Sequence, residues 1–133
     1  MNSYFADTSL FVAFLNPRDE HHELAVAFIR DELNFLVTST WVLVELGNFF
    51  SKSRTRRRFF PFVRDLGVDL LVDIVPPAAD LFEKALHLYH RRADKPWSMT
   101  DCTSFLIMRA RGLSEALTTD HHIVQAGFKI LLT

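Results

Sequence analysis

The chain's architecture follows from a segment near its start, SYFADTSLFVAFL, which spans residues 3–15. Its first four residues are a β-prone run that stops at Asp7-Thr8, and residues 8–15 predict a short helix. Asn16-Pro17 ends that helix, because proline lacks a backbone donor and clashes with the preceding turn. A strand, an acidic side chain and a helix therefore follow one another directly.

The same order of a strand followed by helices returns along the chain. Further β-prone runs cover 35–38, 70–75, 116–119 and 128–132. Apolar residues recur at helical spacing over 20–33, 41–53, 59–66, 79–92 and 100–111. Strands that alternate with helices predict an α/β fold, with a central, mainly parallel five-stranded sheet flanked by helices. No repeat or linker interrupts this order, so residues 1–133 are expected to form one domain.

The composition excludes several classes of protein. Hydrophobic residues make up 49% of the chain, which is too many for a disordered protein. A single cysteine excludes an internal disulfide and suits the reducing cytoplasm. No apolar stretch approaches the roughly 20 residues that cross a bilayer, so we expect no membrane association. No basic residue precedes Asp7, so we expect no signal peptide.

Three aspartates stand where a parallel α/β fold places functional groups. Asp7 and Asp120 each end a β-prone run and begin a helical segment, and Asp101 lies at a predicted helix start. Ligands of such folds bind outside the carboxyl ends of the strands, so Asp7 and Asp120 are expected at one edge of the sheet, and Asp101 could converge on the same pocket. Aspartate is also a favoured N-cap, worth about 1 kcal/mol, so each residue could simply cap a helix. The capping-box spacing of Ser98 and Asp101 supports that alternative.

Glu45 is a fourth acid, within a strongly apolar helical segment. Its neighbours on the helix surface are Trp41, Val42, Leu46 and Phe49. We therefore expect Glu45 to project from the apolar face, where an unpaired ionised carboxylate is strongly unfavourable. Either a bound cation or a buried arginine would offset that cost.

Carboxylates gathered in one pocket repel one another unless a cation neutralises them. Oxygen ligands select Mg²⁺ or Mn²⁺ over Zn²⁺, and such an ion can activate water and stabilise charge on a phosphate. The histidine pairs at 21–22 and 121–122 do not place both imidazoles on one helix face, so no zinc site is predicted. Groups expected to contact the acids or a substrate, if they are not caps or surface residues, are Thr8, Ser39, Ser98, Thr100 and His121.

The order of these acids resembles that of the PIN-domain ribonucleases, in particular the VapC-like toxins of bacterial toxin–antitoxin pairs. The resemblance rests on four segments that together run nearly from end to end of the chain. They are Asp7-Thr8-Ser9, Val42-Leu43-Val44-Glu45, residues 94–102 with Thr100-Asp101-Cys102, and residues 117–122 followed by Ala126-Gly127-Phe128. One segment alone is weak, whereas four in this order are specific.

The resemblance implies a three-layer PIN-like fold and an endoribonuclease that uses Mg²⁺ or Mn²⁺ and leaves a 5′-phosphate and a 3′-hydroxyl. It carries the family's four catalytic and metal-binding acids onto Asp7, Glu45, Asp101 and Asp120, of which the fourth is the least strictly kept in the family. It further implies a toxin that inhibits translation or growth, a cognate antitoxin and a homodimer. A PIN-domain RNA-processing nuclease without a toxin role is the alternative within the family. Asp94 is either an additional acid near the rim or a solvated loop residue.

The formal net charge of −1 conceals a basic segment at 46–64. It holds six of the 15 basic residues and none of the 16 acids, which leaves nine basic and 16 acidic residues elsewhere. Such a segment can neutralise RNA phosphates, or suit an acidic protein partner, or be a solvated helix end. Candidate contacts with RNA or antitoxin are Lys52, Arg54, Arg56, Arg57 and Arg58. Nearby phenylalanines that could form a dimer or antitoxin surface are Phe49, Phe50, Phe59, Phe60 and Phe62.

Two interpretations from other classes remain open. A receiver-like phosphoacceptor module also binds Mg²⁺ with acids at the ends of parallel strands. It needs adjacent acids after the first strand and an acceptor aspartate after the third, whereas this chain has Asp7 alone and then Pro76-Pro77. In a non-enzymatic interpretation the four acids are only helix caps.

Overall fold

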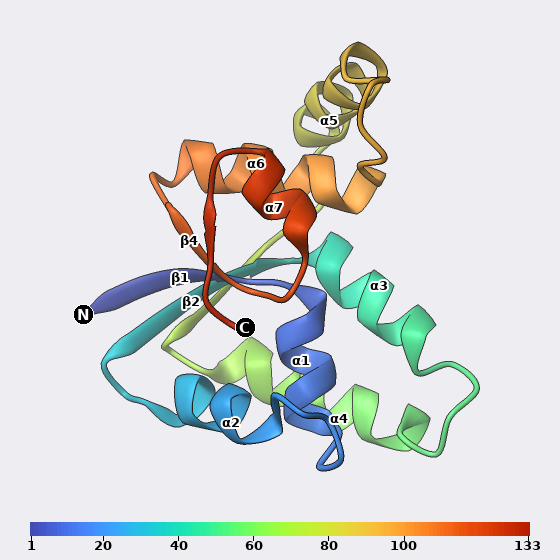
Figure 1. The fold of residues 1–133 in the computed structure, drawn as a ribbon. Coiled ribbons are helices and arrows are strands. Elements are labelled where there is room, and N and C mark those ends of the chain that lie inside the picture. Colours follow the sequence, from blue (N-terminus) through green and yellow to red (C-terminus); the bar gives the residue numbers. More distant parts are fainter.

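The computed structural model describes residues 1–133 and contains one sheet with the strand order β3-β2-β1-β4-β5, in which every pairing is parallel (Figure 1). The strands are β1 (Asn2–Ala6), β2 (Asn34–Ser39), β3 (Val72–Val75), β4 (Glu115–Leu117) and β5 (Lys129–Ile130). The helices are α1 (Thr8–Leu15), α2 (His22–Arg30), α3 (Thr40–Phe49), α4 (Arg56–Val68), α5 (Ala79–Arg91), α6 (Met99–Ala110) and α7 (His121–Gln125). The predicted α/β sheet is confirmed, and it is entirely parallel.

The helices cover the sheet from both sides, which gives three layers. In Figure 1, α1, α2 and α4 lie on one face of the sheet and α6 and α7 on the other. α5 packs against α6, and α3 extends from the end of β2 and contacts α1 and α6. No helix is long and apolar enough to cross a membrane.

The strand order places the ends of β1 and β4 next to each other. From the central β1 the chain builds outward through β2 and β3, and it then returns to the other side of β1 to form β4 and β5. Phe5 pairs with Ala116 and Ala6 with Leu117, so the two strands end at the same level. Ligand sites of parallel sheets form at such reversals of strand order, outside the carboxyl ends.

Aromatic packing fixes the helices on both faces of β1. On one face, Phe11 of α1 packs against Phe62 of α4 with ring centroids 5.5 Å apart. On the other, Phe105 of α6 packs edge-on against Trp97 at 4.9 Å. Phe5, between the two helical layers, is fully buried. These contacts fix α1, which directly follows Asp7, and α6, which contains Asp101.

Several elements are shorter than the sequence predicts, and at two of them an acidic side chain forms a turn at the end of the element. The strand predicted from residue 70 begins at Val72: Asp69 Oδ1 accepts a hydrogen bond from the Leu71 N–H at 2.8 Å, and Leu70 is 93% exposed. The helix predicted to residue 33 ends at Arg30, and Asp31 Oδ1 accepts from the Leu33 N–H at 2.9 Å. Such side-chain contacts compete with helix and strand hydrogen bonds. The helix predicted over 41–53 likewise ends at 49, and the strand predicted over 128–132 covers only 129–130.

Candidate functional site

Asp7 is a buried carboxylate at the carboxyl end of β1, where only 7% of the residue is exposed. Its Oδ2 accepts a hydrogen bond from the Thr118 hydroxyl at 2.8 Å. Burial raises the pKa of Asp7 from 3.8 to about 6, and repulsion from Glu45 and Asp101 adds to the rise, while hydrogen bonds from Thr118 and the Thr8 backbone oppose it. Asp7 occupies the N-cap position of α1, yet its side chain makes no capping hydrogen bond. The cap interpretation therefore does not explain Asp7.

Thr118 joins the ends of β1 and β4 through its buried hydroxyl. Besides donating to Asp7, Thr118 Oγ1 accepts from the Asp120 backbone N–H at 3.0 Å and lies 2.9 Å from Ser9 Oγ. The single hydroxyl proton of Thr118 goes to Asp7, so Ser9 is the donor in the other contact. Ser9 Oγ in turn accepts from the Thr119 N–H at 3.0 Å. Sequence reasoning missed Thr118, although a hydroxyl directly after a strand and two residues before an acid was a usable signal.

Asp101 and Asp120 are both helix caps, and capping engages only one oxygen of each. Asp101 Oδ2 accepts from the Ser98 N–H at 3.0 Å, and Ser98 Oγ accepts from the Asp101 N–H at 3.0 Å, which is the predicted capping box. Asp120 Oδ1 accepts from the His122 N–H at 2.9 Å at the start of α7. The second oxygen of each carboxylate accepts no hydrogen bond from the protein. Capping and ligand binding are therefore compatible at both residues.

His122, rather than the predicted His121, contacts the acids. Its Nδ1 lies 2.9 Å from Asp101 Oδ2 and 3.5 Å from Asp120 Oδ1. His121 is exposed to solvent. Successive residues of a helix project about 100° apart, so only one of two adjacent histidines can face α6. Asp101, Asp120 and His122 each offer a ligand atom within 4.8 Å of the other two, a spacing that suits one metal ion.

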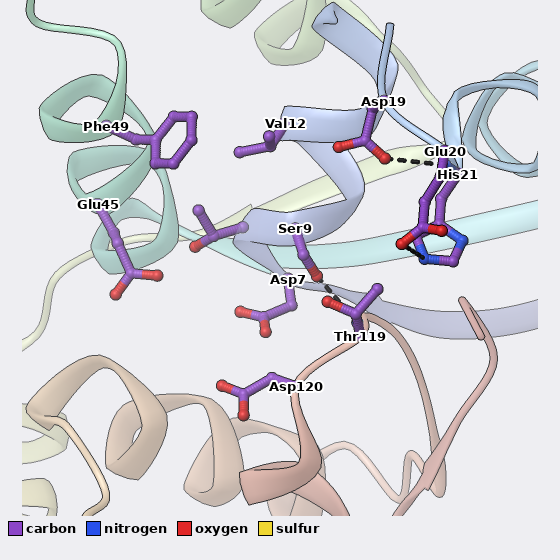
Figure 2. Close-up of a pocket in the computed structure, with 11 residues that line it drawn as sticks. Asp7, Ser9, Val12, Asp19, Glu20, His21, Glu45, Phe49, Thr119 and Asp120 are labelled. Carbon is purple, nitrogen blue, oxygen red and sulfur yellow. Dashed lines mark hydrogen bonds and ion pairs between the residues drawn. The ribbon is translucent and has the colours of Figure 1, made fainter.

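Asp7, Glu45 and Asp120 line one pocket of about 570 Å³. Figure 2 shows the carboxylates of Asp7 and Asp120 close together, with Glu45 reaching from α3 toward the same space. Asp101 is not part of the lining, but it is near enough to raise the pKa of Asp7. The rest of the lining contains no lysine or arginine and consists of Thr8, Ser9, Val12, Asp19, Glu20, His21, Phe49 and Thr119. The pocket is strongly negative and suits a cation.

Glu45 is exposed, so the expectation that it projects from the buried face of its helix is wrong. α3 buries Val42, Leu43 and Leu46, whereas Phe49 is 62% exposed. α3 has apolar residues on its exposed side as well, among them Val44 and Phe49, so the apolar neighbours of Glu45 do not show which side of the helix is buried. Glu45 therefore needs no buried partner and reaches the pocket from its solvent-exposed wall.

Among the predicted hydroxyl-bearing residues, only Thr8 lines the pocket. Thr8 lines the pocket, and its Oγ1 is buried without a hydrogen-bond partner. Ser39 is the N-cap of α3 and accepts from the Val42 N–H at 3.2 Å. Ser98 caps α6, and the half-buried Thr100 in its first turn does not line the pocket.

This donor set fits a hard divalent cation. Asp7, Asp101 and Asp120 come from three different elements, and each has one oxygen fixed by a protein donor and one without a side-chain partner. Free carboxylate oxygens are the ligands that Mg²⁺ and Mn²⁺ prefer. A cation beside Asp7 would also favour its ionised form, which burial and the neighbouring acids disfavour.

The predicted basic residues lie together beyond the rim of the pocket. Lys52 and Arg54 lie in the connection between α3 and α4, and Arg56, Arg57 and Arg58 form the first turn of α4. All five are exposed and none forms an ion pair. Two of them bind backbone carbonyls: Arg58 Nη1 donates to the Leu15 oxygen at 3.0 Å, and Arg56 Nη1 to the Ser51 oxygen at 2.6 Å.

Asp94 forms an exposed ion pair with Arg92 at 3.0 Å and does not line the pocket.

A second hollow, of about 780 Å³, separates α3 from α4 and is more apolar. Of the phenylalanines singled out in the sequence, Phe50 and Phe62 are buried. Phe59 and Phe60 line the hollow, and Phe60 is 68% exposed. Arg56 lies in the same lining. This hollow is called the α3–α4 groove below.

A family model described as PIN domain matches residues 4–129. The chain belongs to the PIN-domain family. The "23S rRNA-specific endonuclease VapC20" of two Mycobacterium tuberculosis strains is 29% identical over 124 residues, which cover 93% of this chain and 94% of the relative. The predicted family is thereby confirmed, and the receiver-like alternative is excluded.

Solved structures of PIN-domain toxins share the fold. The crystal structure of Mycobacterium tuberculosis VapC20, described as a sarcin–ricin loop cleaving toxin, has a TM-score of 0.82 and 28% identity, covering 94% of this chain and 95% of that one. DNA-bound VapBC from Salmonella typhimurium has a TM-score of 0.67 and 18% identity over 98% of each chain. The predicted three-layer PIN-like fold is confirmed.

Replacing Asp7 by asparagine is expected to stabilise the metal-free protein near pH 7.5, by about 1–3 kcal/mol. The pKa of Asp7 is raised from 3.8 to about 6, so the folded state binds this proton more tightly than the unfolded state. The wild-type protein therefore loses stability at this group as the pH rises from about 4 to about 6, and the asparagine variant does not. Urea unfolding with EDTA, at several pH values, measures the difference.

The advantage of the Asp7→Asn variant should shrink as the pH falls through about 6 and approach zero only below 3.8, where the wild-type carboxyl becomes protonated in both states. Asp65→Asn, which removes an exposed acid of α4, is the control for the loss of one surface charge. An advantage that does not change with pH would contradict the raised pKa.

Proposed function

We propose that this protein is a metal-dependent endoribonuclease that hydrolyses RNA phosphodiester bonds. The observation that carries the proposal is a set of three carboxylates, Asp7, Asp101 and Asp120. They lie at the carboxyl ends of β1 and β4 and at the start of α6. In each carboxylate a hydrogen bond fixes one oxygen, and the other has no side-chain partner. Membership of the PIN-domain family supports it, because that family consists of metal-dependent nucleases.

Each acid has a separate task in this proposal. Asp7, Asp101 and Asp120 hold the ion from one side, and the exposed Glu45 completes its binding from α3. When bound, Mg²⁺ or Mn²⁺ lowers the pKa of a water molecule and neutralises charge on the scissile phosphate. Without a cation, a pocket that contains five carboxylates and neither lysine nor arginine would repel that phosphate.

The basic residues are proposed to bind the RNA backbone on its way to the pocket. Phe49, the last residue of α3, lines the acidic pocket, and Lys52, the first basic residue of the segment, follows three residues later. Arg58 ties the segment to the end of α1. Because Lys52, Arg54 and Arg57 are exposed and form no ion pair or hydrogen bond within the protein, their charge is available to phosphates.

The proposed biological role is that of a toxin that inhibits translation or growth. The relative VapC20 is named as a toxin and as an endonuclease specific for 23S rRNA, and the match covers nearly all of both chains. Ribosomal RNA is therefore the first substrate to test. An RNA-processing nuclease without a toxin role would share the site but would not arrest growth.

Two surfaces are proposed for protein partners. The α3–α4 groove combines exposed Phe60 with Arg56, and this combination suits an amphipathic, acidic segment of a cognate antitoxin.

A homodimer is proposed through α5, where Phe82, Leu86 and Tyr89 form an exposed apolar stripe at helical spacing. Sedimentation velocity reports the oligomeric state, and a strictly monomeric protein would contradict the proposed dimer.

Asp7→Asn and Asp101→Asn are each expected to reduce RNA cleavage to the level seen with EDTA, because each removes a charged ligand of the ion. The assay incubates the purified protein with total RNA, including intact ribosomes, in the presence of Mg²⁺ or Mn²⁺. Mapping of the new 5′ ends identifies the cut bonds, which are expected to carry 5′-phosphates.

Asp65→Asn should cleave like the wild type, since Asp65 lies exposed on α4 outside the pocket. Undiminished cleavage by purified Asp101→Asn would refute the site. Growth arrest on expression, relieved by Asp101→Asn, separates a toxin from an RNA-processing nuclease.

The double variant Arg54→Ala, Arg57→Ala is expected to bind RNA more weakly and to lower the slope of log K against log salt by about one for each phosphate that is no longer neutralised. The measurement is RNA affinity between low and moderate salt, without divalent metal, so that cleavage does not interfere. The double variant Arg91→Ala, Arg109→Ala, which removes two exposed arginines from outside the basic segment, is the matched control. An equal salt slope in the double variant and the wild type would exclude this segment from the RNA path.

A further inference from the structure

His122 contacts the carboxylate groups of two of the proposed metal-binding acids, Asp101 and Asp120. Its Nδ1 lies 2.9 Å from Asp101 Oδ2 and 3.5 Å from Asp120 Oδ1, and its backbone N–H donates to Asp120 Oδ1 at 2.9 Å. Asp101 belongs to α6 and His122 to α7. The imidazole therefore bridges the two helices at the point where their acidic side chains approach each other.

The contacts with His122 decide which carboxylate oxygens remain free. Asp101 Oδ2 accepts two hydrogen bonds, from the Ser98 N–H at 3.0 Å and from His122 at 2.9 Å, whereas Asp101 Oδ1 accepts none. Two donors on one oxygen fix the rotation of the carboxylate about its Cβ–Cγ bond. On Asp120 both contacts with His122 are made by Oδ1, which leaves Oδ2 free. Each acid is thus held with one defined oxygen available.

The geometry also determines how the imidazole is protonated at Nδ1. An ionised carboxylate only accepts hydrogen bonds, so at 2.9 Å from Asp101 Oδ2 the Nδ1 atom must be the donor. A nitrogen that carries a proton has no lone pair for a metal. Mg²⁺ and Mn²⁺ also prefer the oxygen ligands that surround it.

We propose that His122 is a positioning residue of the metal site: its Nδ1–H holds Asp101 and ties α7, and with it Asp120, to α6. The proposal rests on the proposed function, because it concerns the same acids. Groups that orient ligands in this way change metal affinity about 10–100-fold when they are removed. His122 is not itself a ligand in this account, although its ring lies within ligand distance of both acids.

The test compares Mn²⁺ dissociation constants, from the electron paramagnetic resonance of free Mn²⁺, for three variants and the wild type. His122→Ala should weaken Mn²⁺ binding at least about tenfold. His122→Asn should recover most of the loss, because asparagine Nδ2 can donate from nearly the position of Nδ1. His121→Ala, which removes the exposed neighbouring imidazole, should bind like the wild type. Equal affinity in His122→Ala and the wild type, or no recovery in the asparagine variant, would overturn the proposal.

Spectroscopy of the wild-type protein tests the same proposal without any variant that might not fold. With ¹⁵N-labelled histidine, long-range ¹H–¹⁵N spectra of the Mg²⁺-loaded protein should show a protonated Nδ1 on His122. Electron–nuclear double resonance of the Mn²⁺-loaded protein should show no coupling to a directly bonded ¹⁵N. A directly bonded nitrogen would make His122 a ligand and overturn the positioning role. If the wild type binds no Mn²⁺ at all, the proposed function itself fails, and this outcome is distinct from equal binding by His122→Ala.

Discussion

The hydrogen bond from the Thr118 hydroxyl to the buried Asp7 carboxylate is the contact on which the site depends. It joins the residue after β1 to the residue after β4, at the place where the strand order reverses. The same hydroxyl accepts from the backbone N–H of Asp120, so one buried group sets the spacing of two acids. Burial raises the pKa of Asp7, and this cost is tolerable in a protein that binds a cation there. The fold thus holds the Asp7 carboxylate where its ionised form is unfavourable unless a cation binds beside it.

Negative and positive charge lie on neighbouring parts of the surface, in the acidic pocket and in the exposed basic residues after α3. The acidic pocket has no cationic side chain in its lining, while the basic residues after α3 form no ion pairs. A net charge of −1 conceals this separation, because it averages a basic segment with an acidic remainder. For a phosphodiester substrate, a metal ion at the acids would offset part of the negative charge of the pocket, and the proposed role of the basic segment is to bind the RNA backbone.

Sequence patterns predicted most of the fold, because β-prone runs and helices with apolar residues at regular spacing can be recognised from neighbouring residues alone. They placed Asp7 and Asp120 at the correct edge of the sheet, since parallel strands end together, and they placed Asp101 at the start of a helix. They failed for Glu45, because an apolar helix packs only part of its apolar surface. Thr118 and His122 were missed for a different reason, because each contacts an element that is distant in the sequence. The place of Thr118 directly after a strand was a usable local signal, whereas no local spacing indicates that His122 contacts Asp101.

Anomalous X-ray diffraction from crystals grown with Mn²⁺ tests the central claim most directly. The account predicts a manganese peak at bonding distance, about 2.1 Å as for Mg²⁺, from an oxygen of Asp7, from Asp101 Oδ1 and from Asp120 Oδ2, with Asp101 Oδ2 still bonded to His122. A peak bound instead by Asp19, Glu20 and His21, on another part of the pocket lining, or no peak in the pocket, would contradict it.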